Sequence, residues 1–256
     1  MNGLPSGETP YGLSAGLSSL TRMANYVLVP GAWLGAWAWD EVAEELRQAG
    51  HGVYPVTLSG LAERRDEAAA EVGQAQHVAD IVAVVEGNDL RDVVLAGHSY
   101  SGIPVGQAAG LIGDRLQRVV YVDSNVPTDG KSFVDGWSDE GRAWVEGQLA
   151  ESGGFWPPLA AEDYAGQDLT DEVVATIVER STPHPGRAIT EPAKLVRPIS
   201  ELPTTYLKCL MDGAVPSSDV LELLKSDSWE LAELPTGHWP MFSQPAALAK
   251  VLLQAG

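Results

Sequence analysis

Cysteine is almost absent from this chain: Cys209 is the only one in 256 residues, so no disulfide can form within the chain. Disulfides are rare in reducing compartments, and a chain without one fits a cytoplasmic protein, which is the location we expect. Long apolar runs are also missing, because no stretch of the sequence approaches the ~20 residues that a membrane-spanning helix needs. We therefore expect no membrane partner.

Basic residues are scarce as well. Lysine and arginine number 16 against 35 aspartates and glutamates, which gives a formal net charge of −19. A surface this acidic repels polyanions, so nucleic acid is not an expected partner. The sequence also lacks a cluster of metal-ligating side chains and a glycine-rich nucleotide-binding loop, and we expect no metal or other cofactor.

Residues 1–23 are rich in glycine, serine and proline. They lack the basic start and continuous apolar segment that mark a secretory signal peptide. Their composition is typical of segments that cannot bury enough apolar surface to fold. The sequence therefore predicts a flexible arm over residues 1–23, with the folded domain beginning directly after it.

The stretch from residue 91 to residue 109 combines the parts of a nucleophile elbow. A short apolar run, Val93-Val94-Leu95-Ala96, has the composition of a strand buried on both faces. The turn Gly97-His98-Ser99-Tyr100-Ser101-Gly102 and a small-residue helix follow it. In such an elbow a serine sits on a sharp turn between strand and helix with its hydroxyl exposed. The usual spelling is Gly-x-Ser-x-Gly; here Ser101 takes the last position and Gly102 comes one residue late.

Strand and helix patterns alternate along most of the chain. Strands that alternate with helices form right-handed βαβ units, which build a parallel sheet covered by helices on both faces. We predict an α/β fold with a mainly parallel six-stranded sheet, formed by a core of residues 24–123 and 203–256. The predicted strands are 25–29, 52–57, 93–96, 118–123, 204–210 and 229–234, and the predicted helices outside the elbow are 37–49, 73–86, 217–225 and 245–254.

The alternation is interrupted over residues 124–202. Helical stretches are expected at 134–150 and 169–180, but no buried strand is, so this region is predicted to form a helical cap over the carboxyl edge of the sheet. It is rich in large aromatic residues, which more often wall an apolar pocket than serve packing alone. A packing insertion without a ligand role is the alternative interpretation.

Three polar residues each follow a predicted strand: Ser99, Asp212 and His238. Groups beyond the carboxyl ends of parallel strands share one crevice, so we expect these side chains to meet there. A serine hydroxyl needs a base, and the base needs an orienting acid. The chain order Ser, Asp, His is that of the α/β-hydrolases. Asp123, at the end of the fourth predicted strand, is the alternative acid, and Asp212 is preferred.

The remaining histidines are assigned other roles. His98 lies inside the elbow and is expected to pack or hydrogen-bond there, while His51 in a turn and His77 on a surface helix are interpreted as structural. His184 lies in the cap region, where contact with a substrate is expected.

An acyl-transfer site must also stabilise an oxyanion, usually with two backbone N–H groups. One is expected from Tyr100, the residue after the nucleophile, and the other from Ala32 in the loop after the first strand. The side chains of Trp33 and Trp239 are interpreted as further substrate contacts.

The sequence resembles the α/β-hydrolase superfamily from Met23 onward, and within it the small esterases that include plant methylesterases, hydroxynitrile lyases and bacterial relatives. The resemblance is carried by residues 27–33, 97–102 and 238–245. The family usually has histidine where this chain has Pro30, and glycine where it has Ser101. Its lyase members carry lysine where this chain has Trp239, so the resemblance implies ester hydrolysis.

The sequence therefore predicts a serine hydrolase that cleaves a small, largely apolar carboxylic ester or lactone through an acyl-enzyme. One alternative uses the same triad for C–C cleavage, lyase or cyclisation chemistry in a biosynthetic pathway. Another is a ligand-binding protein on a hydrolase-like scaffold, because a fold alone does not determine function.

Overall fold

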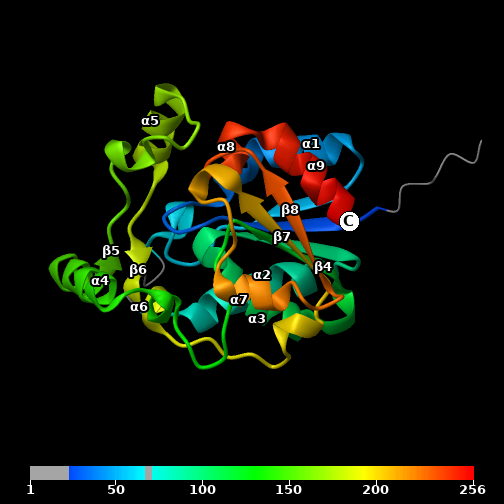
Figure 1. The fold of residues 1–256 in the computed structure, drawn as a ribbon, viewed down its shortest axis with the longest axis horizontal. Helices are drawn as coiled ribbons and strands as arrows, with labels where there is room; N and C mark the ends of the chain where they lie inside the picture. The colour runs from blue at the N-terminus through cyan, green and yellow to red at the C-terminus, as the bar shows by residue number, and fades with distance from the viewer. Residues whose placement is uncertain (1–22, 67–70) are drawn as a thin grey trace, which may run out of the picture.

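A computed structural model describes residues 23–66 and 71–256 of the protein (Figure 1). The arm predicted for residues 1–23 lies outside the described residues except for Met23.

Six strands form one sheet in the order β2-β1-β3-β4-β7-β8, and every neighbouring pair is parallel. The predicted α/β fold with a six-stranded parallel sheet is therefore confirmed. The strands are β1 (Asn25–Val29), β2 (Gly52–Pro55), β3 (Val93–His98), β4 (Leu116–Val122), β7 (Thr204–Cys209) and β8 (Trp229–Leu234).

Helices cover both faces of this sheet, as Figure 1 shows. One face carries α1 (Asp40–Gln48), α8 (Pro240–Ser243) and α9 (Pro245–Ala255), and the other carries α2 (Gln74–Gly87), α3 (Gly102–Ile112) and α7 (Ser218–Leu223). Short 3-10 turns connect the elements: η1 (Ala36–Trp39), η2 (Ala62–Arg64), η4 (Ser99–Ser101), η5 (Gly113–Arg115), η6 (Phe133–Gly136), η7 (Ala161–Tyr164), η8 (Ile199–Glu201) and η9 (Leu210–Asp212).

The core has two halves, one on each side of the sheet. Successive side chains of a strand point to opposite faces, so Val27 and Leu95 join the α2–α3 half while Leu28 and Ala96 join the half beneath α1 and α9. All six residues of β3 are buried. Full burial of a valine or leucine side chain contributes roughly 1.5–3 kcal/mol, which explains why central strands are continuous apolar runs.

Residues 124–202 connect β4 to β7 and extend to one side of the sheet in Figure 1. They contain α4 (Asp139–Glu151), α5 (Asp171–Arg180) and α6 (Gly186–Thr190). The prediction that this region holds no buried strand is wrong, because β5 (Phe155–Trp156) and β6 (His184–Pro185) form an antiparallel ladder. Trp156 and His184 in this ladder are buried. A pair of two-residue strands is too short to show the alternation by which strands are recognised.

The register of the central strands places the site. His98 of β3 pairs with Val122 of β4, so Ser99 and Asp123 follow adjacent strands at the same level.

Within the described residues, no helix combines the length and apolar character needed to cross a membrane.

Candidate active site

Ser99 lies on a sharp turn between β3 and α3. Its φ is +54°, in the left-handed region that non-glycine residues rarely adopt, as expected for a nucleophile elbow. The turn requires glycine on either side of Ser99. A Cβ at Gly97 would lie 2.9 Å from the Ser101 carbonyl oxygen, and one at Gly102 would overlap the Asn125 carbonyl oxygen. The elbow therefore has the strand, turn and helix that its sequence predicted.

Ser101, which stands where the usual motif has glycine, has a definite partner. Its side chain is fully buried, and its hydroxyl donates a hydrogen bond to the Pro30 carbonyl oxygen. The bond joins the elbow to the loop after β1, which is the loop that contains Ala32. The two positions at which this chain departs from the family's usual motifs are therefore in contact.

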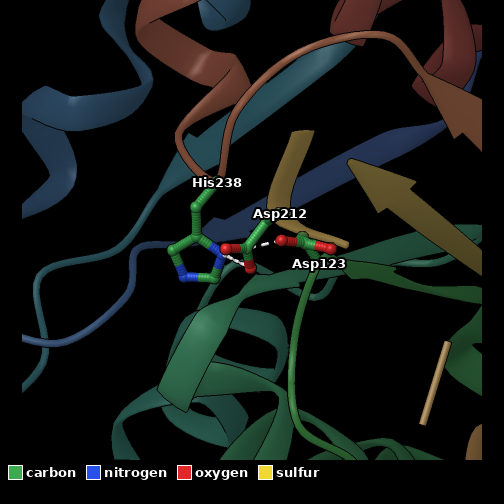
Figure 2. A group of neighbouring side chains, drawn as sticks. All are labelled: Asp123, Asp212 and His238. Carbon is green, nitrogen blue, oxygen red and sulfur yellow. Dashed lines mark hydrogen bonds and ion pairs between the residues drawn. The ribbon is translucent and has the colours of Figure 1, made fainter. Parts of the chain in front are cut away.

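His238 lies in the loop after β8 and faces both the serine and two acids. Its Nε2 is 3.0 Å from Ser99 Oγ. Its Nδ1 faces the two carboxylates (Figure 2), at 2.7 Å from Asp123 Oδ2 and 3.3 Å from Asp212 Oδ2. Two hydrogen bonds hold the backbone of this residue: its N–H donates to Gln167 Oε1 at 2.6 Å, and its carbonyl oxygen accepts from His98 Nε2 at 2.7 Å. His98 thus hydrogen-bonds within the site, as its position in the elbow suggested.

The two acids differ in their surroundings. The Asp123 side chain is 2% exposed, and its Oδ1 accepts hydrogen bonds from Lys208 Nζ at 2.6 Å and from the Cys209 N–H at 3.1 Å. The Asp212 side chain is 44% exposed. The structure thus brings both acids considered from the sequence to the imidazole, with the less favoured Asp123 nearer and more deeply buried.

The acids determine the charge state of His238. Burial opposes the charged imidazole, but hydrogen bonds to Asp123 and Asp212 and the negative charges of both acids outweigh it and raise the pKa of His238 to about 9. The hydrogen bond from His238 is also the main reason that the pKa of Asp212 lies well below its ordinary value. The charged imidazolium is therefore favoured at neutral pH, and the neutral ring that forms as the pH rises is a stronger base than an ordinary imidazole.

Lys208 is a site residue that the sequence reasoning missed. It lies in β7, every residue of which is buried, and its Nζ also donates to the Asp212 carbonyl oxygen at 2.9 Å. Its position in the sequence could have indicated this role, because a lysine inside an otherwise buried strand needs a buried negative partner. Asp123, at the end of the neighbouring strand, is that partner.

The loop after β1 packs directly against the elbow. A Cβ at Gly31 would lie 2.7 Å from His98 Nδ1 and 3.0 Å from Ser99 Cβ, so glycine is required for this close approach. In the described part of the chain, no group accepts a hydrogen bond from the Ala32 N–H. Ala32 therefore has a backbone donor, free within that part of the chain, in the loop that packs against Ser99, which is the loop where the sequence places it.

The three side chains predicted to contact substrate, those of Trp33, His184 and Trp239, are buried at 0–8% exposure. The Trp33 ring packs in a tilted arrangement on that of Trp156, with ring centroids 4.2 Å apart, and the Trp33 backbone N–H donates to His184 Nδ1 at 3.3 Å. Trp239 packs between His238 and Tyr164, with ring centroids at 5.0 and 4.6 Å. None of the three lines the cavity that reaches the acids.

That cavity, of about 660 Å³, is lined in part by Asp123, Asp212 and His238. Its wall also carries Lys131, Lys208, Asp135 and Asp219. The cavity is therefore more polar than the apolar pocket expected from the aromatic residues of the cap region. Three of those residues, Phe133, Trp137 and Trp156, pack on one another and on Trp33, and of these three only Phe133 also lines the cavity.

Asp123, Asp212 and His238 offer possible metal ligand atoms that lie within 4.8 Å of one another. His238 Nδ1 already faces both carboxylates, however, and Lys208 is paired with the second oxygen of Asp123. The ammonium group supplies the positive charge that a metal ion would bring, so these residues fit a proton relay better than a metal centre.

Comparison with known proteins connects this geometry to a family. A carbendazim hydrolyzing esterase of Nocardioides sp. (strain SG-4G) is 28% identical over 254 residues, which cover 91% of this chain and 100% of that protein. Methylesterase 9 of Arabidopsis thaliana is 26% identical over 266 residues, with 91% of this chain and 98% of that protein covered.

Among solved structures, an extracellular α/β-hydrolase from a Paenibacillus species superposes with a TM-score of 0.79 at 24% identity, covering 91% of this chain and 99% of its own. At that identity the likeness shows the fold alone. A family model described as the alpha/beta hydrolase family matches residues 26–251. The resemblance to α/β-hydrolases and methylesterases inferred from three motifs is thus confirmed, and the chain belongs to the alpha/beta hydrolase family.

Proposed function

We propose that this protein is a serine hydrolase that cleaves a small carboxylic ester through an acyl-enzyme. The observation that carries the proposal is the relay from Ser99 Oγ to His238 Nε2 at 3.0 Å and from His238 Nδ1 to a carboxylate at 2.7 Å. A hydroxyl, an imidazole and an acid in this order are the parts that activate a serine at neutral pH.

In the proposed reaction, Ser99 Oγ attacks the ester carbonyl carbon while His238 Nε2 takes the hydroxyl proton. The Ala32 and Tyr100 N–H groups donate to the carbonyl oxygen as it becomes an oxyanion. His238 then returns the proton to the departing alkoxide, so the alcohol leaves and the acyl group stays on Ser99. A water molecule, deprotonated by His238, releases the acid and regenerates the serine.

We assign both acids to the imidazole. Asp123 makes the shorter contact and is held by Lys208, so it orients the ring and stabilises its positive charge. Asp212, which the sequence favours, lies 3.3 Å from the same nitrogen and adds a second negative charge. The cap region of residues 124–202 also contributes to the site in this proposal, because the side chain of Gln167 accepts a hydrogen bond from the His238 backbone N–H.

The relatives support ester cleavage through their names, which are those of esterases and methylesterases. The charged cavity that reaches the acids does not include Ser99 among its lining residues, so the proposed substrate stays the small, largely apolar ester or lactone expected from the sequence. One relative, norfluorocurarine synthase 2 of Strychnos sp, has a name outside ester hydrolysis at 24% identity. A synthase among the relatives keeps chemistry other than ester hydrolysis, carried out by the same triad, as the second candidate.

The test is hydrolysis of p-nitrophenyl acetate and butyrate by the wild-type protein and by Ser99→Ala. We expect release of p-nitrophenol by the wild type and a loss of at least about 10³-fold in the variant. A serine-directed fluorophosphonate should give one adduct, on Ser99, by mass spectrometry. If p-nitrophenol release persists in Ser99→Ala, or the label is found on another residue, the proposed function is wrong.

A further inference from the structure

Trp33, the residue after Ala32, has an unusual backbone conformation. Its φ is +67°, and a bulky residue in this region carries strain that persists only where surrounding contacts enforce it. Three hydrogen bonds do so. The Trp33 N–H donates to His184 Nδ1 at 3.3 Å, its carbonyl oxygen accepts from the Thr182 N–H at 3.0 Å, and its indole Nε1 donates to the Trp156 carbonyl oxygen at 3.1 Å.

All three partners of Trp33 belong to residues 124–202, and two of them belong to the β5–β6 ladder that the sequence did not predict. Trp156 and His184 are directly paired in that ladder. The loop with the proposed oxyanion donor is therefore held by the cap region and by the Ser101–Pro30 bond from the elbow.

The His184 ring is suited to holding a backbone N–H. It is fully buried, and burial keeps its pKa well below the ordinary value, with the neighbouring His77 lowering it further. The ring is therefore neutral and offers one unprotonated nitrogen. Because Nδ1 accepts from Trp33, the proton lies on Nε2, which has no hydrogen-bond partner among the described residues.

His184 also touches the second oxyanion residue. Its ring lies 4.5 Å from that of Tyr100 in an edge-to-face arrangement. The Tyr100 hydroxyl is held in turn by His77, at 2.9 Å from Nδ1, and His77 Nε2 donates to the Ser59 carbonyl oxygen at 2.9 Å. His77 is completely buried on the inner face of α2, which fits its interpretation as a structural residue.

We propose that His184 is a positioning residue for the oxyanion hole: by accepting the Trp33 N–H and packing on Tyr100, it fixes the two segments that present the oxyanion donors. The proposal rests on the proposed serine hydrolase function and replaces the expectation that His184 contacts substrate. It also makes the oxyanion hole dependent on the cap region, because the β5–β6 ladder must lie on the core for these contacts to exist.

An oxyanion hole acts on the transition state more than on the bound ester. A loosened hole therefore lowers kcat and leaves KM nearly unchanged, whereas a lost substrate contact raises KM. Binding of a transition-state analogue is a second readout. A trifluoromethyl ketone forms an adduct with the serine, and the oxyanion of this adduct occupies the hole. Its inhibition constant should therefore rise by a similar factor as kcat falls.

The decisive experiment compares three replacements of His184. In His184→Asn the amide oxygen can take the place of Nδ1, in His184→Gln it reaches instead toward the place of Nε2, and His184→Leu has no acceptor. Trp144→Ala, at a residue of α4 whose side chain is exposed, is the control in the same region. Each variant is assayed with p-nitrophenyl butyrate and the trifluoromethyl ketone, and its midpoint of thermal unfolding is recorded.

We expect His184→Leu and His184→Gln to lower kcat about 10- to 100-fold, with KM within about twofold and a similar weakening of the ketone. His184→Asn should retain most of the wild-type kcat and most of the affinity for the ketone, and Trp144→Ala should match the wild type in both quantities. The proposal would be overturned if His184→Asn and His184→Gln lose the same amount of kcat, if KM alone rises, or if ketone binding is unchanged. If His184→Leu does not fold, the difference in kcat between His184→Asn and His184→Gln still tests the proposal. Ser99-dependent activity that is unaffected at His184 contradicts this inference alone, whereas activity independent of Ser99 contradicts the proposed function.

Discussion

Lys208 and Asp123 form a buried ion pair: Nζ lies 2.6 Å from Oδ1, and the two side chains are 7% and 2% exposed. The same ammonium group donates to the carbonyl oxygen of Asp212 at 2.9 Å. One lysine therefore holds both residues whose carboxylates face His238. Removing it takes the buried lysine partner from the Asp123 carboxylate and leaves His238 as the remaining cationic group beside it, which destabilises the fold.

We predict that Lys208→Met lowers the free energy of unfolding by about 3–5 kcal/mol, because the Asp123 carboxylate then lacks its partner. Urea unfolding followed by circular dichroism measures this loss. The control is Lys225→Met, since Lys225 pairs with Glu222 on the surface, and such pairs contribute at most about 1 kcal/mol. Asp123→Asn combined with Lys208→Met should recover part of the stability. Equal effects of the two single lysine variants would show that the buried pair contributes nothing special.

The two acids should substitute for each other in part. In a hydrolase with one acid, its replacement by asparagine costs about 10⁴-fold in kcat. Here we expect about 10- to 10³-fold for Asp123→Asn, less for Asp212→Asn, and the full loss of about 10⁴-fold for the double variant. Steady-state kinetics with p-nitrophenyl butyrate tests this order. If Asp212→Asn alone matches the double variant, Asp212 is the single working acid, as the sequence favoured.

The pH dependence follows from His238, which must be neutral to accept the Ser99 proton. Its pKa is raised to about 9, so kcat/KM should increase about tenfold per pH unit below that value and level off above it. Removing Asp212 takes away one group that raises this pKa, so Asp212→Asn should move the rise to lower pH. A rise centred near 6.5 in the wild type would show that the acids do not stabilise the imidazolium.

The same pKa predicts how stability changes with pH. A folded-state pKa of about 9 lies above the ordinary 6.5, so the folded protein binds the proton more tightly than the unfolded chain. The resulting stabilisation is fully present below pH 6.5 and is lost as the pH rises from there through about 9. Urea unfolding of the wild type and of His238→Gln at pH 6 and pH 10 measures it. The difference in stability between the two proteins should be larger at pH 6.

Sequence patterns predicted the sheet well but could not decide between the two acids, for physical reasons. Central strands of a parallel sheet are buried on both faces, so they are continuous apolar runs, and the predicted strands 25–29 and 229–234 match β1 and β8. Asp123 and Asp212 follow β4 and β7, which are neighbours in the sheet. Sequence position therefore predicts the same crevice for both, and only the distances to His238 separate them.

The remaining differences between prediction and structure come from contacts between residues far apart in the chain. His77 was interpreted as a structural residue of a surface helix, and its ring is buried with hydrogen bonds to Ser59 and Tyr100 that the sequence does not show. The predicted substrate contact of His184 came from its place in an aromatic-rich region. Its hydrogen bond to Trp33 joins residues 151 positions apart, and no local pattern encodes that contact.

Gly102 is expected to be indispensable although the glycine of the motif is shifted to it. Its backbone is helical, with φ of −56°, so alanine is compatible with the conformation itself. A Cβ there, however, would overlap the Asn125 carbonyl oxygen and lie 2.5 Å from Ser124 Oγ. The Asn125 N–H donates to the Ser99 carbonyl oxygen at 3.2 Å, so any shift of Asn125 reaches the nucleophile. Alanine must therefore displace the elbow.

We predict that Gly102→Ala destabilises the protein by about 1–3 kcal/mol and lowers kcat at least about 100-fold. Gly147→Ala is the matched control, because Gly147 lies within α4 and a Cβ there meets no atom within 4 Å. The control should raise stability by about 0.5–1 kcal/mol through helix propensity and leave kcat unchanged. Thermal unfolding and p-nitrophenyl butyrate hydrolysis are measured for both. Wild-type activity in Gly102→Ala would mean that the helix can retreat from Asn125 without moving Ser99, and that the close packing of the elbow is dispensable for its chemistry.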